Sequence, residues 1–166
     1  MVITKIEAQK KKGRYNIYLN DTFAFGVDEA TVVKYALFKG TELTKEQIEE
    51  IQHDDCIQQA YQKALHFLNF KLRSTKEVYE KLEKLEFDED IINEVLGKLH
   101  EQNFINDTFY AESYLNQAKF VTFKGPKSVV FDLQKKGISD KVIQTVLEGY
   151  TLKEQLENAI QIAQSY

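Results

Sequence analysis

Two stretches of the chain, residues 78–96 and 129–147, carry the same pattern of apolar side chains 51 positions apart. Each stretch has the three- and four-residue apolar spacing of two short amphipathic helices joined by a brief connection. Repetition at such a period predicts stacked supersecondary units that bury their apolar faces on one another. The coincident pairs are Val78 with Val129, Leu82 with Leu133, Phe87 with Ile138, Ile91 with Val142, Ile92 with Ile143, Val95 with Val146 and Leu96 with Leu147.

Helix-start signals recur through the chain after Gly40. Some are capping boxes, in which a Ser or Thr at the N-cap is followed three residues later by Glu or Gln. Others are single N-cap residues, and one is a proline at the first helical position, where its missing N–H costs no hydrogen bond. Asp54-Asp55 either breaks the first of these helices or re-caps it. The expected starts are Thr44, Ser74, Asp88, Asp107, Gly125-Pro126, Ser139 and Thr151.

The first 27 residues predict β structure instead. Apolar and polar residues alternate on both sides of Asn20-Asp21, a two-residue hairpin turn, and an earlier strand over Val2–Ala8 is expected to pair with this hairpin. A short helix with Asp28 as its N-cap and Gly40 near its end should follow. The inward strand residues are Tyr15, Ile17, Leu19, Phe23, Phe25 and Val27, and the apolar side of the helix is Val32, Val33, Ala36 and Leu37.

These elements define a mainly α chain with a small N-terminal β-hairpin and short-helix extension, followed by tandem helical repeats. We expect an extension over residues 1–43, a linker helix with the first repeat over 44–105, and the second repeat over 106–150. Residues 151–166 match the first helix of a third repeat. The sequence is therefore expected to be a truncated or unusually short form.

Charge is divided unevenly along the 166 residues, whose net charge is −4. Residues 44–104 carry −6 and residues 105–150 carry +1. This overall charge argues against a protein whose main ligand is nucleic-acid phosphate, because such a protein needs clustered positive charge. No apolar run is long enough to span a membrane, and the N-terminus lacks the order of a signal peptide. One cysteine, Cys56, fits a reducing compartment.

Motifs for chemistry are missing from the sequence. Cys56 lies three residues from His53, but neither an oxyanion element nor a third group accompanies the pair, so a small side chain at a helix start is the better interpretation. His66 and His100 are too far from His53 in sequence to form a zinc motif, and no glycine-rich phosphate loop occurs. The sequence predicts no enzyme, no metal and no cofactor.

Seven cations are the candidate partner-binding residues. Arg73 and Lys124 occupy equivalent positions just before a helix start in the two repeats, which favours them over the others. They could contact acidic groups of a protein filament or nucleic-acid phosphates. The alternative is that these cations are ordinary solvated surface residues, and that Lys135 and Lys136 stabilise the C-terminus of a helix. The set is Lys71, Arg73, Lys119, Lys124, Lys127, Lys135 and Lys136.

Aromatic residues of the second repeat are interpreted mainly as core. Phe120 and Phe123 lie between Lys119 and Lys124, so stacking on a base or filling a partner pocket is the alternative for them. The remaining aromatic core candidates are Phe104, Phe109, Tyr110 and Tyr114.

At this point the sequence resembles the RecX family, regulatory proteins that modulate the RecA recombinase. The motifs that carry the resemblance are KLRSTKEVYEKL within residues 64–85, FINDTFYAESY at 104–114 and KGPKSVVFDLQKKGIS at 124–139. The N-terminal stretch, with YNIYLND and LFKGTELT, is similar to the extension of members from Gram-positive bacteria. Two positions depart from the family pattern: Asn103 stands where glycine is frequent, and Glu86 stands where the second repeat has Gly137.

The resemblance implies tandem three-helix repeats in an elongated curved array. It also implies a non-enzymatic, cytoplasmic, monomeric regulator that binds RecA, in the groove of its filament on single-stranded DNA. It further implies inhibition of recombination, ATPase and coprotease activities. Weak contact with single- or double-stranded DNA and no membrane partner are also expected. The alternative function is a helical DNA-binding module with weak nonspecific affinity. Direct base readout is not expected, because the middle helices of both repeats begin without arginine.

Overall fold

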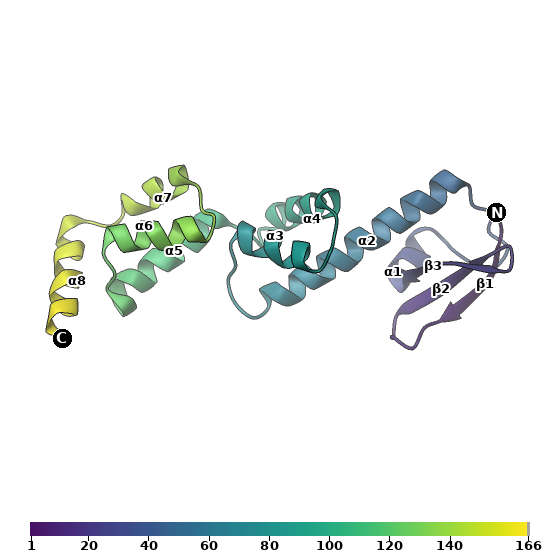
Figure 1. Cartoon of the computed structure of the whole chain (residues 1–166), viewed down its shortest axis with the longest axis horizontal. Helices are drawn as coiled ribbons and strands as arrows, with labels where there is room; N and C mark the ends of the chain where they lie inside the picture. The colour runs from purple at the N-terminus through teal and green to yellow at the C-terminus, as the bar shows by residue number, and fades with distance from the viewer. Residues whose placement is uncertain (166) are drawn as a thin grey trace. The chain divides into compact units, whose positions relative to one another are not determined.

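The computed structural model describes residues 1–165, which form a mainly α-helical chain with one small antiparallel sheet at the N-terminus, as the sequence predicts (Figure 1). It divides into two compact units, Met1–Gln62 and Lys63–Tyr166, and the division falls inside the long helix α2. Within the described residues the elements are β1 (Ile3–Ala8), β2 (Arg14–Leu19), β3 (Thr22–Asp28), α1 (Glu29–Lys34), α2 (Lys45–Leu68), α3 (Thr75–Lys84), α4 (Glu89–Glu101), α5 (Asp107–Gln117), the π-helical turn η1 (Ala118–Thr122), α6 (Pro126–Lys135), α7 (Asp140–Leu147) and α8 (Leu152–Gln164).

The N-terminal sheet has the strand order β1-β2-β3, with both pairings antiparallel. Asn20 and Asp21 form the hairpin turn with φ values of 48° and 66°, the positive values that a two-residue turn of this kind requires. One face of the sheet packs on Leu37, Leu43 and Ile51 to make the core of this unit. The predicted hairpin and its pairing with the first strand are therefore confirmed.

Phe23 is a correction to the predicted strand pattern. Its side chain is exposed, whereas Phe25 and Val27 are buried. Ile17 pairs with Phe25 but Tyr18 pairs with Phe23, so β3 carries one extra residue, a β-bulge, and Phe23 before the bulge faces the opposite side of the sheet from Phe25. Phe23 therefore lies opposite Tyr18 on the outer face, where the two rings meet edge to face at 5.9 Å.

The short helix α1 also differs from the prediction. Asp28 is its N-cap residue, but the carboxylate makes no capping bond and instead accepts a 2.7 Å hydrogen bond from Arg14. The helix ends well before Gly40, since Ala36 already has a φ of 51°. Val33, expected on the apolar side, is exposed because the one-turn helix presents only its other side to the core.

Helix α2 runs without a break through Asp54-Asp55, which settles the open question of whether these residues interrupt it. Asp55 is buried and its carboxylate accepts hydrogen bonds from the Asp28 backbone N–H at 2.8 Å, the Thr31 hydroxyl at 3.1 Å and Arg14 at 3.3 Å. The charge is thus satisfied by tertiary partners, so the helix needs no break to solvate it.

The two repeats build their cores as the sequence predicts. All seven coincident pairs are buried or half-buried, and Val78, Val129, Leu82 and Leu133 are fully buried. In the second repeat α5, α6 and α7 lie side by side around one cluster that includes Leu115 (Figure 1). The capping boxes at Thr44, Ser74 and Thr151, the Ser139 cap and the proline at the start of α6 are all present.

Asp107 is not the N-cap of α5, contrary to the prediction. The N-cap is Asn106, whose side chain accepts a hydrogen bond from the Phe109 backbone N–H. The Asp107 carboxylate instead accepts from the Thr75 backbone N–H at 2.8 Å and from the Thr75 hydroxyl at 3.0 Å, and so satisfies the start of α3 in the other repeat.

Both positions that depart from the family pattern have the left-handed backbone conformation that favours glycine. Glu86 and Gly137 occupy equivalent positions and both are left-handed, with φ values of 68° and 76°. Asn103 is left-handed as well, at 60°. The first repeat therefore makes the same helix ending as the second with a residue that adopts it less readily than glycine does.

Candidate interaction surface

Arg73 is held inside the first repeat. Its guanidinium lies 3.9 Å from the centre of the Phe67 ring and 3.7 Å from the Glu77 carboxylate, and its side chain is only 16% exposed. Within the described residues its Nε has no hydrogen-bond partner. Stacking on an aromatic face suits a planar, weakly hydrated cation. A partner could reach Arg73 only by disturbing these contacts.

The Glu77 carboxylate has several partners at the junction of the two repeats. Sequence reasoning recognised Glu77 only as the second residue of the Ser74 capping box. Its carboxylate accepts from the Ser74 backbone N–H, and it lies 3.7 Å from both Arg73 and Lys136. It also helps burial to raise the pKa of Tyr110 to about 12. Lys136, a candidate from the second repeat, is therefore paired with the first.

The junction continues along α3. The Lys76 ammonium donates to the Lys135 carbonyl at 3.2 Å, and the Lys76 stem packs on Gly137. A Cβ at Gly137 would lie 2.6 Å from the Lys76 Cβ, so glycine is required there by this approach as well as by its positive φ. At the end of α6, the Lys135 carbonyl and the Lys136 ammonium thus both contact the first repeat and stabilise the packing of the two repeats.

Lys124 takes part in a polar network of the second repeat. Its ammonium lies 2.8 Å from the Asp132 carboxylate and 3.2 Å from the Tyr114 hydroxyl, which itself donates to Asp132. The hydrogen bonds from Lys124 and Tyr114 lower the pKa of Asp132, and the bond to Asp132 raises the pKa of Lys124. Lys124 is partly exposed, so a partner could still meet its outer side.

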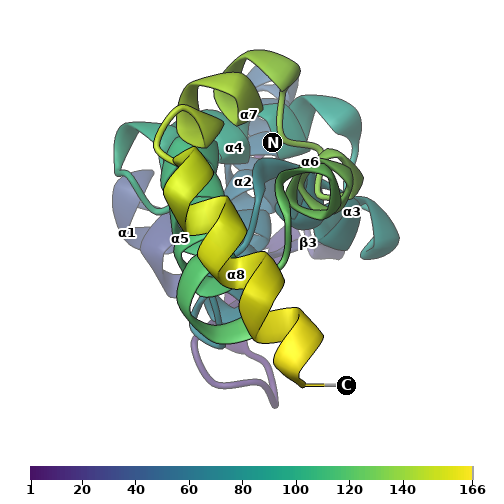
Figure 2. The ribbon, with the colours of Figure 1, turned by 90° about the vertical axis from the view of Figure 1, so that its left-hand side faces the viewer.

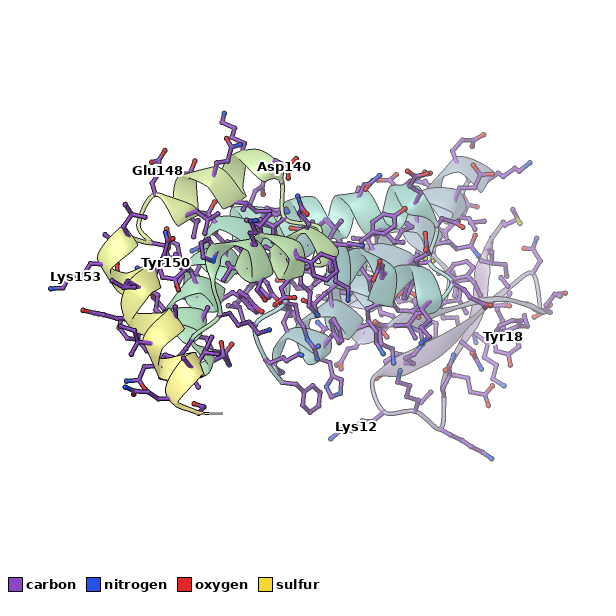
Figure 3. The ribbon with its side chains drawn as sticks, turned by 60° about the vertical axis from the view of Figure 1, so that its left-hand side comes forward. Lys12, Tyr18, Asp140, Glu148, Tyr150 and Lys153 are labelled. Atoms are coloured by element: carbon purple, nitrogen blue, oxygen red, sulfur yellow. The ribbon has the colours of Figure 1, made fainter. Side chains whose placement is uncertain are left out.

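Lys119 anchors α8 rather than facing solvent. Its ammonium donates to the Gly149 carbonyl at 2.5 Å and lies 3.0 Å from Glu154, and its side chain is 11% exposed. The hydrogen bond that Glu154 accepts from Lys119 lowers the pKa of Glu154. The adjacent Tyr150 donates to the Lys124 carbonyl and accepts from Asn158 (Figure 3 shows Tyr150 directed inward beside α8).

Three of the seven candidate cations keep their ammonium groups in solvent: Lys71 before α3, and Lys127 and Lys135 on α6. Among residues 1–165, none of the three side chains makes an ion pair; Lys135 lies 5.2 Å from the Phe131 ring centre. The seven predicted cations therefore fall into two groups. Lys71, Lys127 and Lys135 are available to a partner, and the other four are engaged within the fold.

Several predicted core aromatics are exposed, which corrects the sequence interpretation. Phe104 and Phe109 are about half exposed and Phe120 is 71% exposed, whereas Tyr110 and Tyr114 pack against the core as expected. Phe120 is turned outward by η1, where the helix adds an extra residue per turn, and Phe123 ends the turn with a φ of 56°. Phe120 and Phe123 line a shallow cleft of about 200 Å³ beside α8.

Helix α8 faces the second repeat with polar residues. Its buried residue is Asn158, while the apolar residues Leu152, Leu156 and Ile160 are exposed. Lys153 also projects outward (Figure 3), and no other described element covers the outer side of α8 in Figure 2. Among the described residues, nothing packs on these three apolar side chains.

Other candidate chemistry does not assemble. Among residues 1–165, no group of three or more His, Cys, Asp or Glu side chains is placed to hold a metal ion. Cys56 is exposed and lies in the middle of α2 rather than at the helix start predicted from the sequence. None of the helices in this part of the chain combines the length and apolar content needed to cross a bilayer.

The fold and this surface define a class: a helical-repeat protein with charged and aromatic side chains on its solvent face. Two family models match the chain, "Regulatory protein RecX N-terminal domain" over residues 1–44 and "RecX, first three-helix domain" over residues 60–99. A solved structure of a regulatory protein RecX is 37% identical, covers 99% of this chain and 81% of its own, and superposes with a TM-score of 0.80.

Further relatives agree. The crystal structure of RecX from Lactobacillus salivarius is 40% identical over 68% of this chain and 73% of its own, with a TM-score of 0.64. The regulatory proteins RecX of Leuconostoc mesenteroides and Listeria monocytogenes are 45% and 40% identical, over 97% and 96% of this chain. The chain belongs to the RecX family of regulatory proteins. It spans 60% of the length of these two curated relatives.

Proposed function

We propose that the chain is a non-enzymatic regulator that binds RecA assembled on single-stranded DNA and inhibits its recombination, ATPase and coprotease activities. The observation that carries this proposal is family membership over nearly the whole chain, with relatives named as regulatory proteins. We also propose that it acts as a cytoplasmic monomer, with repeats over residues 44–105 and 106–150 and an extension over 1–43. Residues 151–166 then begin a third repeat.

The contacts within the fold support a narrower set of partner-binding residues than the seven cations of the sequence. We propose Lys71, Lys127 and Lys135 as the primary contacts, because binding a partner would cost none of the three an ion pair among residues 1–165. Lys124 and Lys136 follow, since each keeps about 40% of its side chain exposed beyond its ion pair. Arg73 and Lys119 act by holding the surface in place.

The test is binding of the labelled chain to RecA assembled on single-stranded DNA with a slowly hydrolysed nucleotide, set beside binding to the same DNA alone. We expect tight binding to the filament, much weaker binding to the DNA, and inhibition of the DNA-dependent ATPase. Equal binding to filament and bare DNA, with no effect on the ATPase, would favour the helical DNA-binding module and contradict the proposal.

A further inference from the structure

One stripe of helix α6 places an exposed aromatic ring between two lysines that make no ion pair among residues 1–165, and the Lys135 ammonium lies 5.2 Å from the centre of that ring. Lys127, Phe131 and Lys135 follow at four-residue spacing on the side opposite the buried Val129 and Leu133, and Phe131 is 60% exposed. At a rise of 1.5 Å per residue the two lysines are about 12 Å apart along the helix. These three residues are called the α6 stripe below.

The first repeat shows that this arrangement is not a consequence of the repeat itself. The equivalent stripe of α3 is Lys76, Glu80 and Lys84, where Glu80 lies 3.8 Å from Lys76. A carboxylate thus neutralises the middle of that stripe. In the second repeat a phenylalanine replaces the carboxylate, and its ring neither joins the core nor meets an acid.

The acids near the α6 stripe are engaged elsewhere. Asp132 is paired with Lys124, and Asp140 accepts a hydrogen bond from Gln134. The stripe therefore presents positive charge on both sides of an aromatic face. Phosphates complement the lysines and the face of an unpaired base complements the ring, a combination typical of sequence-independent single-strand binding.

We propose that the α6 stripe binds a single strand of nucleic acid, with Phe131 stacked on an unpaired base and Lys127 and Lys135 on flanking phosphates. The lysine separation of about 12 Å matches three to four stacked nucleotides at about 3.4 Å each. A duplex hides its base faces, so it can use only the lysines. The proposal does not depend on RecA, because the strand itself is the ligand.

The experiment is a fluorescence anisotropy titration of a short labelled oligo(dT) at several salt concentrations. Phe131→Ala should weaken binding about fivefold or more, because stacking contributes about 1 kcal/mol or more per base. An abasic strand of the same length should bind the wild type and Phe131→Ala equally. The double variant Lys127→Gln/Lys135→Gln should reduce the slope of log affinity against log salt by about 1.4.

Matched controls come from the same unit. Lys84→Gln changes the equivalent lysine of the first repeat, and Phe109→Ala removes another half-exposed ring, so both should bind oligo(dT) as the wild type does. Thermal unfolding should be unchanged in every variant, since all these side chains are exposed. The proposal is overturned if the wild type fails to bind oligo(dT) at low salt, or if Phe131→Ala binds as tightly as the wild type. Weaker RecA binding by Phe131→Ala without DNA, at unchanged oligo(dT) affinity, would make the stripe a protein contact and would equally overturn it.

Discussion

The two repeats share a core and differ at the surface. Equivalent apolar residues are buried in both repeats. In the two connections, Glu86 and Gly137 have the same left-handed backbone conformation. On the solvent side, however, Glu80 of the first repeat becomes Phe131 in the second. The repeated positions carry the fold, whereas under the proposal above partner binding depends on the positions that have diverged.

The cation before each middle helix illustrates the same difference. Arg73 stacks on Phe67, and the Lys81 ammonium lies 5.6 Å from the centre of the same ring, so the first repeat uses an aromatic ring to hold its cations. In the second repeat Lys124 pairs with Asp132, the residue equivalent to Lys81. One position in the repeat is therefore served by two kinds of interaction.

The largest effect should come from breaking the shared core. Leu82 and Leu133 are both fully buried, so Leu82→Ala and Leu133→Ala should each lower the free energy of unfolding by about 2–5 kcal/mol. Urea unfolding followed by circular dichroism measures this. A cost below about 1 kcal/mol in one repeat only would show that the two cores are not equivalent.

The second effect separates the two connections. Gly137→Ala should lower the free energy of unfolding by about 1–3 kcal/mol, because the new Cβ meets Lys76 and the φ is left-handed. Glu86→Gly should raise it by up to about 1 kcal/mol, because glycine adopts this conformation without the side-chain penalty. The same unfolding measurement checks both, and destabilisation by Glu86→Gly would contradict the assigned backbone.

These two predictions show which parts of the fold could be predicted from the sequence. Caps and apolar spacing are local, so Ser74, Ser139, Thr151 and the seven core pairs were predictable from the chain alone. Asn106 and Asp107 are both good N-cap residues, and the choice between them depends on Thr75, which lies 32 positions away in sequence. Phe23 was misassigned because a bulge at Ile17/Tyr18 leaves no clear trace in the apolar pattern.

The candidate site was less predictable for the same reason. The partners that engage Lys119 are 30 and 35 residues away, at Gly149 and Glu154, and no spacing rule connects them. Phe131 could have been found, since its four-residue spacing from Lys127 and Lys135 sets it opposite the buried face of α6. Sequence reasoning considered base stacking only for Phe120 and Phe123, as the alternative to core packing, and their neighbouring lysines are engaged within the fold.

A third, smaller effect should distinguish the two cation arrangements by pH. Asp132→Asn should lower the free energy of unfolding by about 1 kcal/mol at pH 7. The pKa of Asp132 is lowered in the folded state, so this stabilisation is present above about pH 4 and is lost as pH falls through the folded pKa. Lys81→Gln, at the equivalent position, should leave the acid side of the profile unchanged. Unfolding curves between pH 3 and pH 7, a range set by the ordinary carboxyl pKa of about 4, check both variants, and identical profiles for Asp132→Asn and the wild type would contradict the network.

The smallest effect is expected on the exposed side of α8. Leu156→Lys should change the free energy of unfolding by less than about 0.5 kcal/mol, because the side chain is 64% exposed. Asn158→Ala should cost about 1–2 kcal/mol, because it removes a buried 2.7 Å hydrogen bond to Tyr150. Thermal or urea unfolding compares them, and a reversed order would mean that the apolar side of α8 is the packed one.

The most direct test of the account compares equivalent surface positions of the two repeats in binding to the RecA filament. Lys135→Glu and Lys84→Glu reverse the charge of lysines that are exposed and 51 positions apart. Anisotropy of the labelled chain titrated with filament should show at least about fivefold weaker binding for Lys135→Glu, the loss expected for one exposed charge contact of about 1 kcal/mol. Lys84→Glu should bind as the wild type does. Equal weakening by both variants, or by neither, would contradict the claim that the second repeat's diverged surface carries the function.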